Sequence, residues 1–156
     1  MKPRVEDMHP WLHDAYQFWK AKMDAAGIPF VLTCVGRTNA EQEALYAQGR
    51  KSLKEVNQMR KECGMSPLSE SENKRKVTWT MNSKHRLHAD GKSKAFDFAI
   101  VKPDKKTLSW DVKWDADHDG IPEYEEAVRF AEEVGLEAGA RWKTPDVPHL
   151  QLRTQI

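Results

Sequence analysis

The most regular hydrophobic pattern lies near the N-terminus, where apolar residues recur at spacings of three and four along residues 11–26. This spacing predicts a helix whose buried face carries Leu12, Tyr16, Trp19 and Met23. Gly27 ends the pattern, and Pro29 follows at a position where proline commonly stops a helix. A second helix is predicted over residues 38–49, because Thr38 and Glu41 have the spacing of a capping box.

Short runs of β-branched and aromatic residues predict the strands. These runs are residues 29–35, 77–81, 95–101, 108–112 and 149–153. Two more helices are predicted over residues 53–63 and 121–134, closed by Gly64 and Gly135, and residues 66–76 have the composition of a polar loop.

The order of these elements indicates the fold class. Helices come first and last, short strands lie between them, and no strand–helix unit repeats. We therefore expect an α+β fold, with a small, mainly antiparallel sheet flanked by helices, in a single domain over residues 1–156. Residues 52–76 are predicted to form a surface insertion in that domain.

Composition and charge narrow the function classes. The 156 residues carry a net charge of +1, so no overall field favours nucleic acid or an anionic membrane. The N-terminal residues are of mixed charge without an apolar segment, and no apolar run is long enough to cross a bilayer. Two cysteines in unlike surroundings are typical of a reducing compartment. We expect a chain made in the cytoplasm, without membrane insertion, and monomeric.

Three residues beside or within the predicted strands are candidate metal ligands: His85, Asp97 and His149. Asp97 lies between Phe96 and Phe98 in an apolar strand, where an unpaired carboxylate would be costly to bury. A metal ion would offset that cost. Two imidazoles and one carboxylate with an open fourth position are typical of catalytic zinc, whose bound water has a pKa near ~7.

Such a water needs a base, and Asp146 stands three residues before His149. Pro148 between them restricts the backbone, so both side chains can face the same water. Each of these signals is weak by itself, and the combination carries the argument.

The combination resembles a known family. Residues 83–85 (Ser-Lys-His), 95–97 (Ala-Phe-Asp) and 146–149 (Asp-Val-Pro-His) are similar to the Ser-x-His, Ala-x-Asp and Asp-x-x-His motifs of a zinc peptidase family. That family comprises the VanY-type D-alanyl-D-alanine carboxypeptidases and the phage L-alanyl-D-glutamate endopeptidases. The resemblance extends upstream through residues 36–38 and 41–50 and downstream through 135–139 and Trp142, so that it spans about residues 30–152 in the family's order.

The resemblance implies a role for each matched residue. His85, Asp97 and His149 would bind zinc, and Asp146 would be the general base. Arg37 would bind substrate and stabilise the oxyanion, where a fixed cation is most effective in a site that excludes water. Ser83 would support the first ligand from the second shell of the metal.

The sequence departs from the family pattern between the first two ligands. More residues separate His85 from Asp97 than in many members, and the extra segment brings a rival ligand, His88, and a rival carboxylate, Asp90. Asp97 is preferred because its surroundings match a strand, whereas Asp90 and Gly91 form an ordinary turn sequence.

Residues 115–126 form a second candidate metal site. They match the twelve-residue calcium loop of EF hands, with Asp115, Asp117, Asp119 and Glu126 at positions one, three, five and twelve and Gly120 at position six. However, Pro122 occupies position eight, and a strand rather than a helix is predicted before the loop. The alternative is an acidic turn at the N-terminus of the helix over 121–134. If calcium does bind, the active site would depend on it.

These observations lead to a functional expectation. The chain would hydrolyse a peptide bond of the peptidoglycan stem, and the L-alanyl-D-glutamate bond is preferred because no export signal is seen. It would then be a phage or prophage endolysin, held in the cytoplasm of the infected cell until lysis. The alternatives are a D-alanyl-D-alanine carboxypeptidase and a non-catalytic, zinc-containing wall-binding domain. Asp146 favours an enzyme, since a binding domain needs no base.

Overall fold

The structure is a computed structural model that describes residues 3–78, 80–81, 84–85, 87 and 91–153. The expectations for Ser83, His88 and Asp90 fall outside the described residues. The elements are η1 (Val5–Asp7), α1 (Pro10–Ala25), β1 (Phe30–Cys34), α2 (Asn39–Ala47), α3 (Leu53–Glu62), α4 (Glu70–Asn73), β2 (Ala95–Val101), β3 (Leu108–Ser109), α5 (Glu123–Glu133), β4 (Leu136–Ala138), η2 (Gly139–Arg141) and β5 (His149–Leu152).

The strands form one five-stranded sheet in the order β1-β2-β5-β4, and β3 pairs with the far end of β2. Every strand pair in this sheet is antiparallel, which confirms the predicted α+β class. The register places Asp97 of β2 opposite Cys34 of β1 on one side and His149 of β5 on the other. These three positions therefore form one row across the sheet.

One face of the sheet forms the hydrophobic core. Phe96, Phe98 and Ile100 alternate along β2 and are buried against α1 and α5. Trp19 of α1 packs edge-on against Phe98, and its indole nitrogen donates a hydrogen bond to the carbonyl of Ala127 in α5, at 2.9 Å. Because alternate residues of a strand point to opposite faces, Asp97 is left on the face away from these helices.

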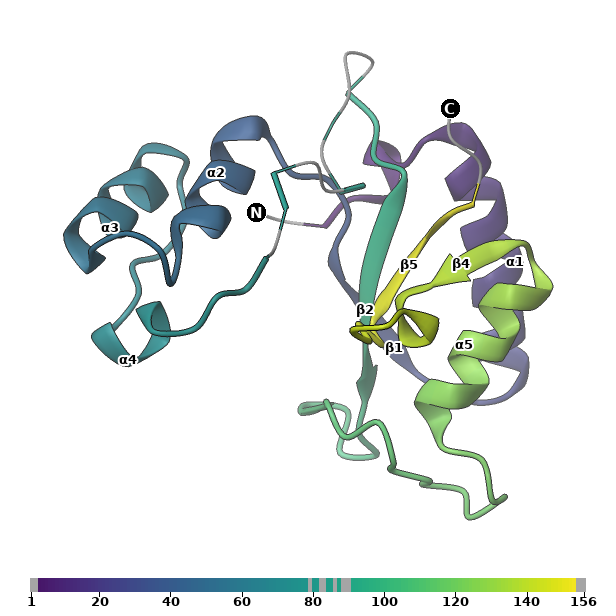
Figure 1. The fold of residues 1–156 in the computed structure, drawn as a ribbon. Coiled ribbons are helices and arrows are strands. Elements are labelled where there is room, and N and C mark those ends of the chain that lie inside the picture. Colours follow the sequence, from purple (N-terminus) through teal and green to yellow (C-terminus); the bar gives the residue numbers. More distant parts are fainter. Residues whose placement is uncertain (1–2, 79, 82–83, 86, 88–90, 154–156) are drawn as a thin grey trace.

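The helices α2, α3 and α4 stand together on the other side of the sheet from α1 and α5 (Figure 1). The capping box of Thr38 and Glu41 starts α2 as predicted. The amide of Asn57 in α3 exchanges hydrogen bonds with the backbone of Leu68, and Gln48 donates to the carbonyl of Glu72 in α4. The predicted polar loop over 66–76 thus contains a short helix that was missed, held by side-chain amides.

The strand predicted over residues 77–81 is wrong for the residues of that segment that the structure describes. Its backbone bonds to side chains instead of a neighbouring strand. Gln42 donates to the carbonyl of Thr80 at 2.7 Å, and Arg50 donates to that of Thr78 at 3.0 Å. The opposite error occurs at β4, a strand that was not predicted because three residues carry little periodicity. No helix within the described ranges is long and apolar enough to span a membrane.

Candidate metal centre

A groove of about 870 Å³ opens on the face of the sheet that carries Asp97. It is lined by the three predicted ligands, by Asp146 and Arg37, and by residues from the 77–84 and 142–145 segments. The groove therefore contains residues of β2 and β5, of the segment that follows β1, and of the loops that precede β2 and β5. Sequence positions that lie far apart meet here.

The three predicted ligands converge through one atom each. His85 Nε2 lies 3.0 Å from Asp97 Oδ1 and 3.1 Å from His149 Nδ1, and His149 Nδ1 lies 3.1 Å from Asp97 Oδ1. Tetrahedral ligands at zinc bond lengths lie about 3.3 Å from one another. The triangle is thus close to the spacing that a tetrahedral ion requires.

The charges of this triangle favour a cation. Burial alone would raise the pKa of Asp97, but hydrogen bonds from His149 and His85 hold it far below its ordinary value. Burial alone would lower the pKa of His85, yet the hydrogen bond and charge of Asp97, with a contribution from Cys34, raise it to about 10. When no metal ion occupies the triangle, the ionised carboxylate of Asp97 therefore keeps a proton on His85. The proton and a metal ion compete for the same place.

Hydrogen bonds on the outer nitrogens fix both imidazoles. His85 Nδ1 lies 3.0 Å from the carbonyl of Val35, and His149 Nε2 lies 2.8 Å from Oε1 of Gln151. In each ring the outer nitrogen donates, so the inner nitrogen keeps its lone pair for a metal. Gln151 in turn donates to Glu137, which also accepts from the indole of Trp142.

Ser93 is a supporting residue that no sequence motif indicated. Its side chain is fully buried, and its hydroxyl lies 2.6 Å from the carbonyl of Val35 and 3.3 Å from that of Lys84. It therefore joins the loop of His85 to the end of β1.

Cys34 is a further residue of the site that the sequence analysis missed. Its sulfur, a nitrogen of His85 and a carboxylate oxygen of Asp97 all lie within 4.8 Å of one another. A β-bulge between Leu32 and Cys34 shifts the register and brings Cys34 into the row of Asp97. Two ligand sets are thus sterically open, one with His149 and one with Cys34. The set with His149 has distances of 3.0–3.1 Å between its ligand atoms and an outer hydrogen bond on each ring.

Asp146 lies at the rim of the groove, where surrounding protein partly removes it from water. This desolvation, followed by the nearby charge of Asp97, raises its pKa, while His149, His85 and Arg37 oppose the shift. The backbone of Asp146 is held by Gly139, whose carbonyl accepts from the Asp146 amide at 2.9 Å. A Cβ at position 139 would collide with the carbonyl oxygen of Asp146, so only glycine allows this approach.

Arg37 reaches the groove from the segment between β1 and α2. Its backbone pairs with His85 and Leu87, and its guanidinium donates to Oε1 of Gln42 at 3.1 Å. Gln42 is fully buried, and besides accepting from Arg37 it donates to the hydroxyl of Thr78 and the carbonyl of Thr80. The guanidinium Nε is buried and has no acceptor among the described residues.

The predicted calcium residues lie at the other end of the molecule. Asp115, Asp117 and Asp119 gather as predicted, and Glu123 joins them with ligand oxygens within 4.8 Å of one another. Glu126 is the fourth residue predicted, and burial, followed by contact with Asp119, raises its pKa to about 7.

Comparison with known proteins adds to this geometry. None of the protein-family models compared with the chain matches it. The chain is 29% identical over 151 residues, 96% of its length, to the peptidoglycan L-alanyl-D-glutamate endopeptidase CwlK of Bacillus subtilis (strain 168), and the match covers 76% of that protein. This similarity supports the resemblance of the sequence to the VanY-type peptidase family. The match therefore includes the sheet, the groove and the helices around them.

The family resemblance is consistent with the residues that meet in the groove. The described chain brings together His85, Asp97 and His149 as a group that could hold a metal ion, with Asp146 and Arg37 beside it. Cys34, whose sulfur lies beside His85 and Asp97, is a feature of the site that the resemblance did not imply.

Proposed function

We propose that the chain is a zinc-dependent peptidase that hydrolyses the L-alanyl-D-glutamate bond of the peptidoglycan stem peptide. The observation that carries the proposal is the meeting of His85, Asp97, His149 and Asp146 in one groove. The similarity to CwlK, a peptidoglycan L-alanyl-D-glutamate endopeptidase, supports the choice of bond.

The residues present fit zinc. Two imidazole nitrogens and one carboxylate oxygen face a common point, each imidazole is fixed by an outer hydrogen bond, and the groove leaves one side open. We infer that His85, Asp97 and His149 hold the ion. When bound, zinc would supply Lewis-acid polarisation and a water acidified to a pKa near ~7.

The remaining chemistry belongs to side chains of the chain. Asp146 would accept the proton of the attacking water and then deliver it to the departing amine, and its raised pKa suits both roles. Arg37 would donate to the oxyanion that forms as the carbonyl is attacked, held in place by Gln42. Arg37 and Lys84 both line the groove, and these two cations suit an anionic stem peptide.

The test is digestion of purified peptidoglycan, with released fragments identified by mass spectrometry. We expect new N-terminal D-glutamate, lost on chelation and restored by zinc. Asp146→Asn should lower the rate by about 10²–10⁴-fold, while Asp14→Asn, at an exposed position of α1, serves as the matched control. Release of terminal D-alanine would instead identify a carboxypeptidase. A folded, zinc-loaded protein that binds the wall without cleaving it would identify a binding domain.

The resemblance to phage endopeptidases supports a role in lysis, in which the chain is held in the cytoplasm until the membrane is breached. Expression in a bacterium whose wall it digests should leave the cells intact. Permeabilising the membrane should then cause lysis in cells that carry the wild type and not in cells that carry Asp146→Asn. Lysis without permeabilisation would contradict this role.

A further inference from the structure

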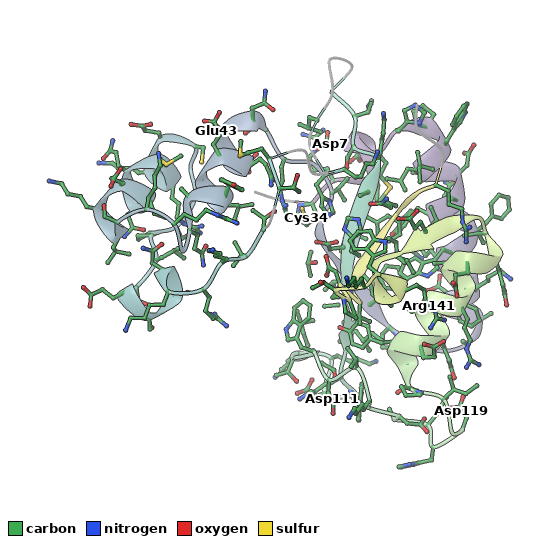
Figure 2. All side chains as sticks on the ribbon, viewed as in Figure 1. Asp7, Cys34, Glu43, Asp111, Asp119 and Arg141 are labelled. Carbon is green, nitrogen blue, oxygen red and sulfur yellow. The ribbon has the colours of Figure 1, made fainter. Side chains whose placement is uncertain are left out.

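The loop between β3 and α5 gathers carboxylates far from the groove. Asp115, Asp117, Asp119 and Glu123 each place an oxygen within 4.8 Å of the others. Figure 2 shows Asp119 in this loop, beyond the first turn of α5 and away from Cys34 at the site. Counted from Asp115, Glu123 occupies position nine of the twelve-residue calcium loop, a position that commonly contributes to the ion.

Glu123 is the residue that indicates a ligand. Its side chain is only 4% exposed, and its Oε2 accepts from the amide of Ala116. Its Oε1 is buried with no hydrogen-bond donor among the described residues, and the same holds for Oδ1 of Asp115. Two buried carboxylate oxygens without donors, in one cluster, are expensive to desolvate. A cation between them would satisfy both.

The other carboxylate oxygens are used to shape the loop. Oδ2 of Asp115 accepts from the amide of Gly120 at 2.9 Å, and Oδ1 of Asp119 accepts from that of Ile121 at 2.8 Å. Gly120 has a φ of +89°, which a side chain would strain. These bonds fold the chain around the cluster and leave Oδ1 of Asp115 turned away from any donor.

The alternative, an acidic turn at the N-terminus of α5, accounts for the acids in its first turn, which include Glu123 and Glu126, but not for the buried, unpaired oxygens of Glu123 and Asp115. No side chain caps the N-terminus of α5, where Pro122 is the N-cap residue. Glu123 instead bonds to Ala116, which precedes the helix by several residues. Ionisation of these carboxylates is also disfavoured. Burial, then contact with Asp119, raises the pKa of Glu126 to about 7, and burial raises the pKa of Glu123.

We propose that residues 115–126 form a calcium site, with carboxylate oxygens from Asp115, Asp117, Asp119 and Glu123. Glu126, at position twelve beside Asp119, supplies a further oxygen. An all-oxygen ligand set is suited to calcium rather than zinc, so the two metal sites of the chain would be chemically distinct.

The site connects to the rest of the fold through α5. Tyr124, next to Glu123, donates to the carbonyl of Ser109 at 2.6 Å and accepts from the amide of Ile100 on β2. Arg141 pairs with Glu125 at 2.7 Å and leads into the segment of Asp146. Calcium would therefore fix the start of α5 against the sheet and stabilise the whole chain.

The experiment measures calcium binding directly, in the full-length chain. The Asp97→Asn background removes a ligand of the groove, so that terbium luminescence excited through Trp114 reports on the loop alone. Calcium should displace terbium at one site per chain, with a dissociation constant of roughly 10⁻⁴–10⁻³ M, as in weaker calcium loops. In the zinc-loaded wild type, calcium at a hundredfold excess over that constant should raise Tm by about 5–10 °C.

Two ligand variants and one control complete the test. Glu123→Gln and Asp117→Asn should abolish the calcium-dependent rise in Tm, while Asp111→Asn, outside the ligand set, should keep it. Glu123→Gln should also raise the Tm of the calcium-free protein, because it removes a buried charge. No calcium effect on the wild type, or an equal effect in Glu123→Gln and Asp117→Asn, would overturn the proposal.

Discussion

Nδ1 of His149 lies 3.1 Å from Oδ1 of Asp97, although 52 positions separate the two residues in the chain. The antiparallel register of β2 and β5 causes this contact, since it sets Asp97 directly opposite His149. Side chains opposite one another in such a pair share a face of the sheet. Strand pairing alone thus brings two of the predicted ligands together in the groove.

The ligand set can be tested by substitution. Asp97→Asn and His149→Ala should each reduce bound zinc far below one ion per chain, as measured by elemental mass spectrometry after dialysis. Cys34→Ser should keep the full zinc content, because we place Cys34 outside the ligand set. Loss of zinc in Cys34→Ser, with retention in His149→Ala, would show that the ion is held by Cys34, His85 and Asp97 instead.

Gln151 should control how tightly the metal is held. Its Oε1 accepts from Nε2 of His149, which keeps Nδ1 free for the ion. Gln151→Met preserves the volume and removes the acceptor, so zinc affinity should fall by about 10–100-fold. Competition with a chromogenic chelator measures this affinity, and Gln151→Glu, which keeps an acceptor oxygen, is the matched variant. Equal affinity in the wild type and Gln151→Met would refute the positioning role.

Arg37 should act on turnover more than on binding. If its guanidinium supports the oxyanion, Arg37→Lys should lower kcat by about 10²–10³-fold with a smaller change in KM. The kinetics can be followed on a soluble stem peptide. Arg129→Lys, on the exposed side of α5, controls for the change in side-chain type. A rise in KM at unchanged kcat would show that Arg37 only binds substrate.

Gly139 should be intolerant of a side chain. Gly139→Ala would force its Cβ against the carbonyl oxygen of Asp146, and such overpacking costs about 1–3 kcal/mol of unfolding free energy. Because the displaced segment carries Asp146, activity should fall further than stability alone predicts. Urea denaturation and the rate of peptide hydrolysis measure the two effects. Ala140→Gly, which alters the neighbouring backbone without adding an atom, should keep most of the activity.

The stability of the calcium-free protein should fall as the pH rises from about 4.5 to about 7. Glu126 has a folded pKa of about 7 against an ordinary value of 4.5. Between these values the native state holds a proton that the unfolded state has released, so raising the pH favours unfolding. Burial raises the pKa of Glu123 and contributes in the same direction.

Thermal unfolding across this pH range measures the effect. Calcium should suppress it, because the bound ion takes the place of the proton, and Glu126→Gln should flatten the profile without calcium. Parallel profiles of the wild type and Glu126→Gln would show that other groups cause the pH dependence.

Several features of the fold and the site follow from local sequence. The apolar run around Asp97 predicts its strand. Because successive strand residues point to opposite faces, the strand then places Asp97 away from the face of Phe96 and Phe98. The capping box of Thr38 and Glu41 begins α2, and Gly135 follows the end of α5 with a φ of +87°. These signals act within a few residues and depend on backbone geometry alone.

Other features depend on contacts between distant segments. Cys34 reaches the site through a β-bulge. Ser93 and Gln42 donate to the carbonyls of Val35 and Thr80, which lie 58 and 38 positions away in the chain. Likewise, residues 77–78 and 80–81 have the composition of a strand, but side chains of α2 and the residues that follow it bind the backbone there.

The sequence by itself therefore determined the fold class and the positions of most elements, because each is encoded in local periodicity, and its resemblance to a known family predicted the metal ligands. Only the tertiary structure decided which side chains support His85 and His149, that Cys34 lies beside them, and that Glu123 is buried in the acidic cluster. Those outcomes depend on strand register and packing, where partners are chosen by the three-dimensional arrangement of the backbone and not by distance along the chain.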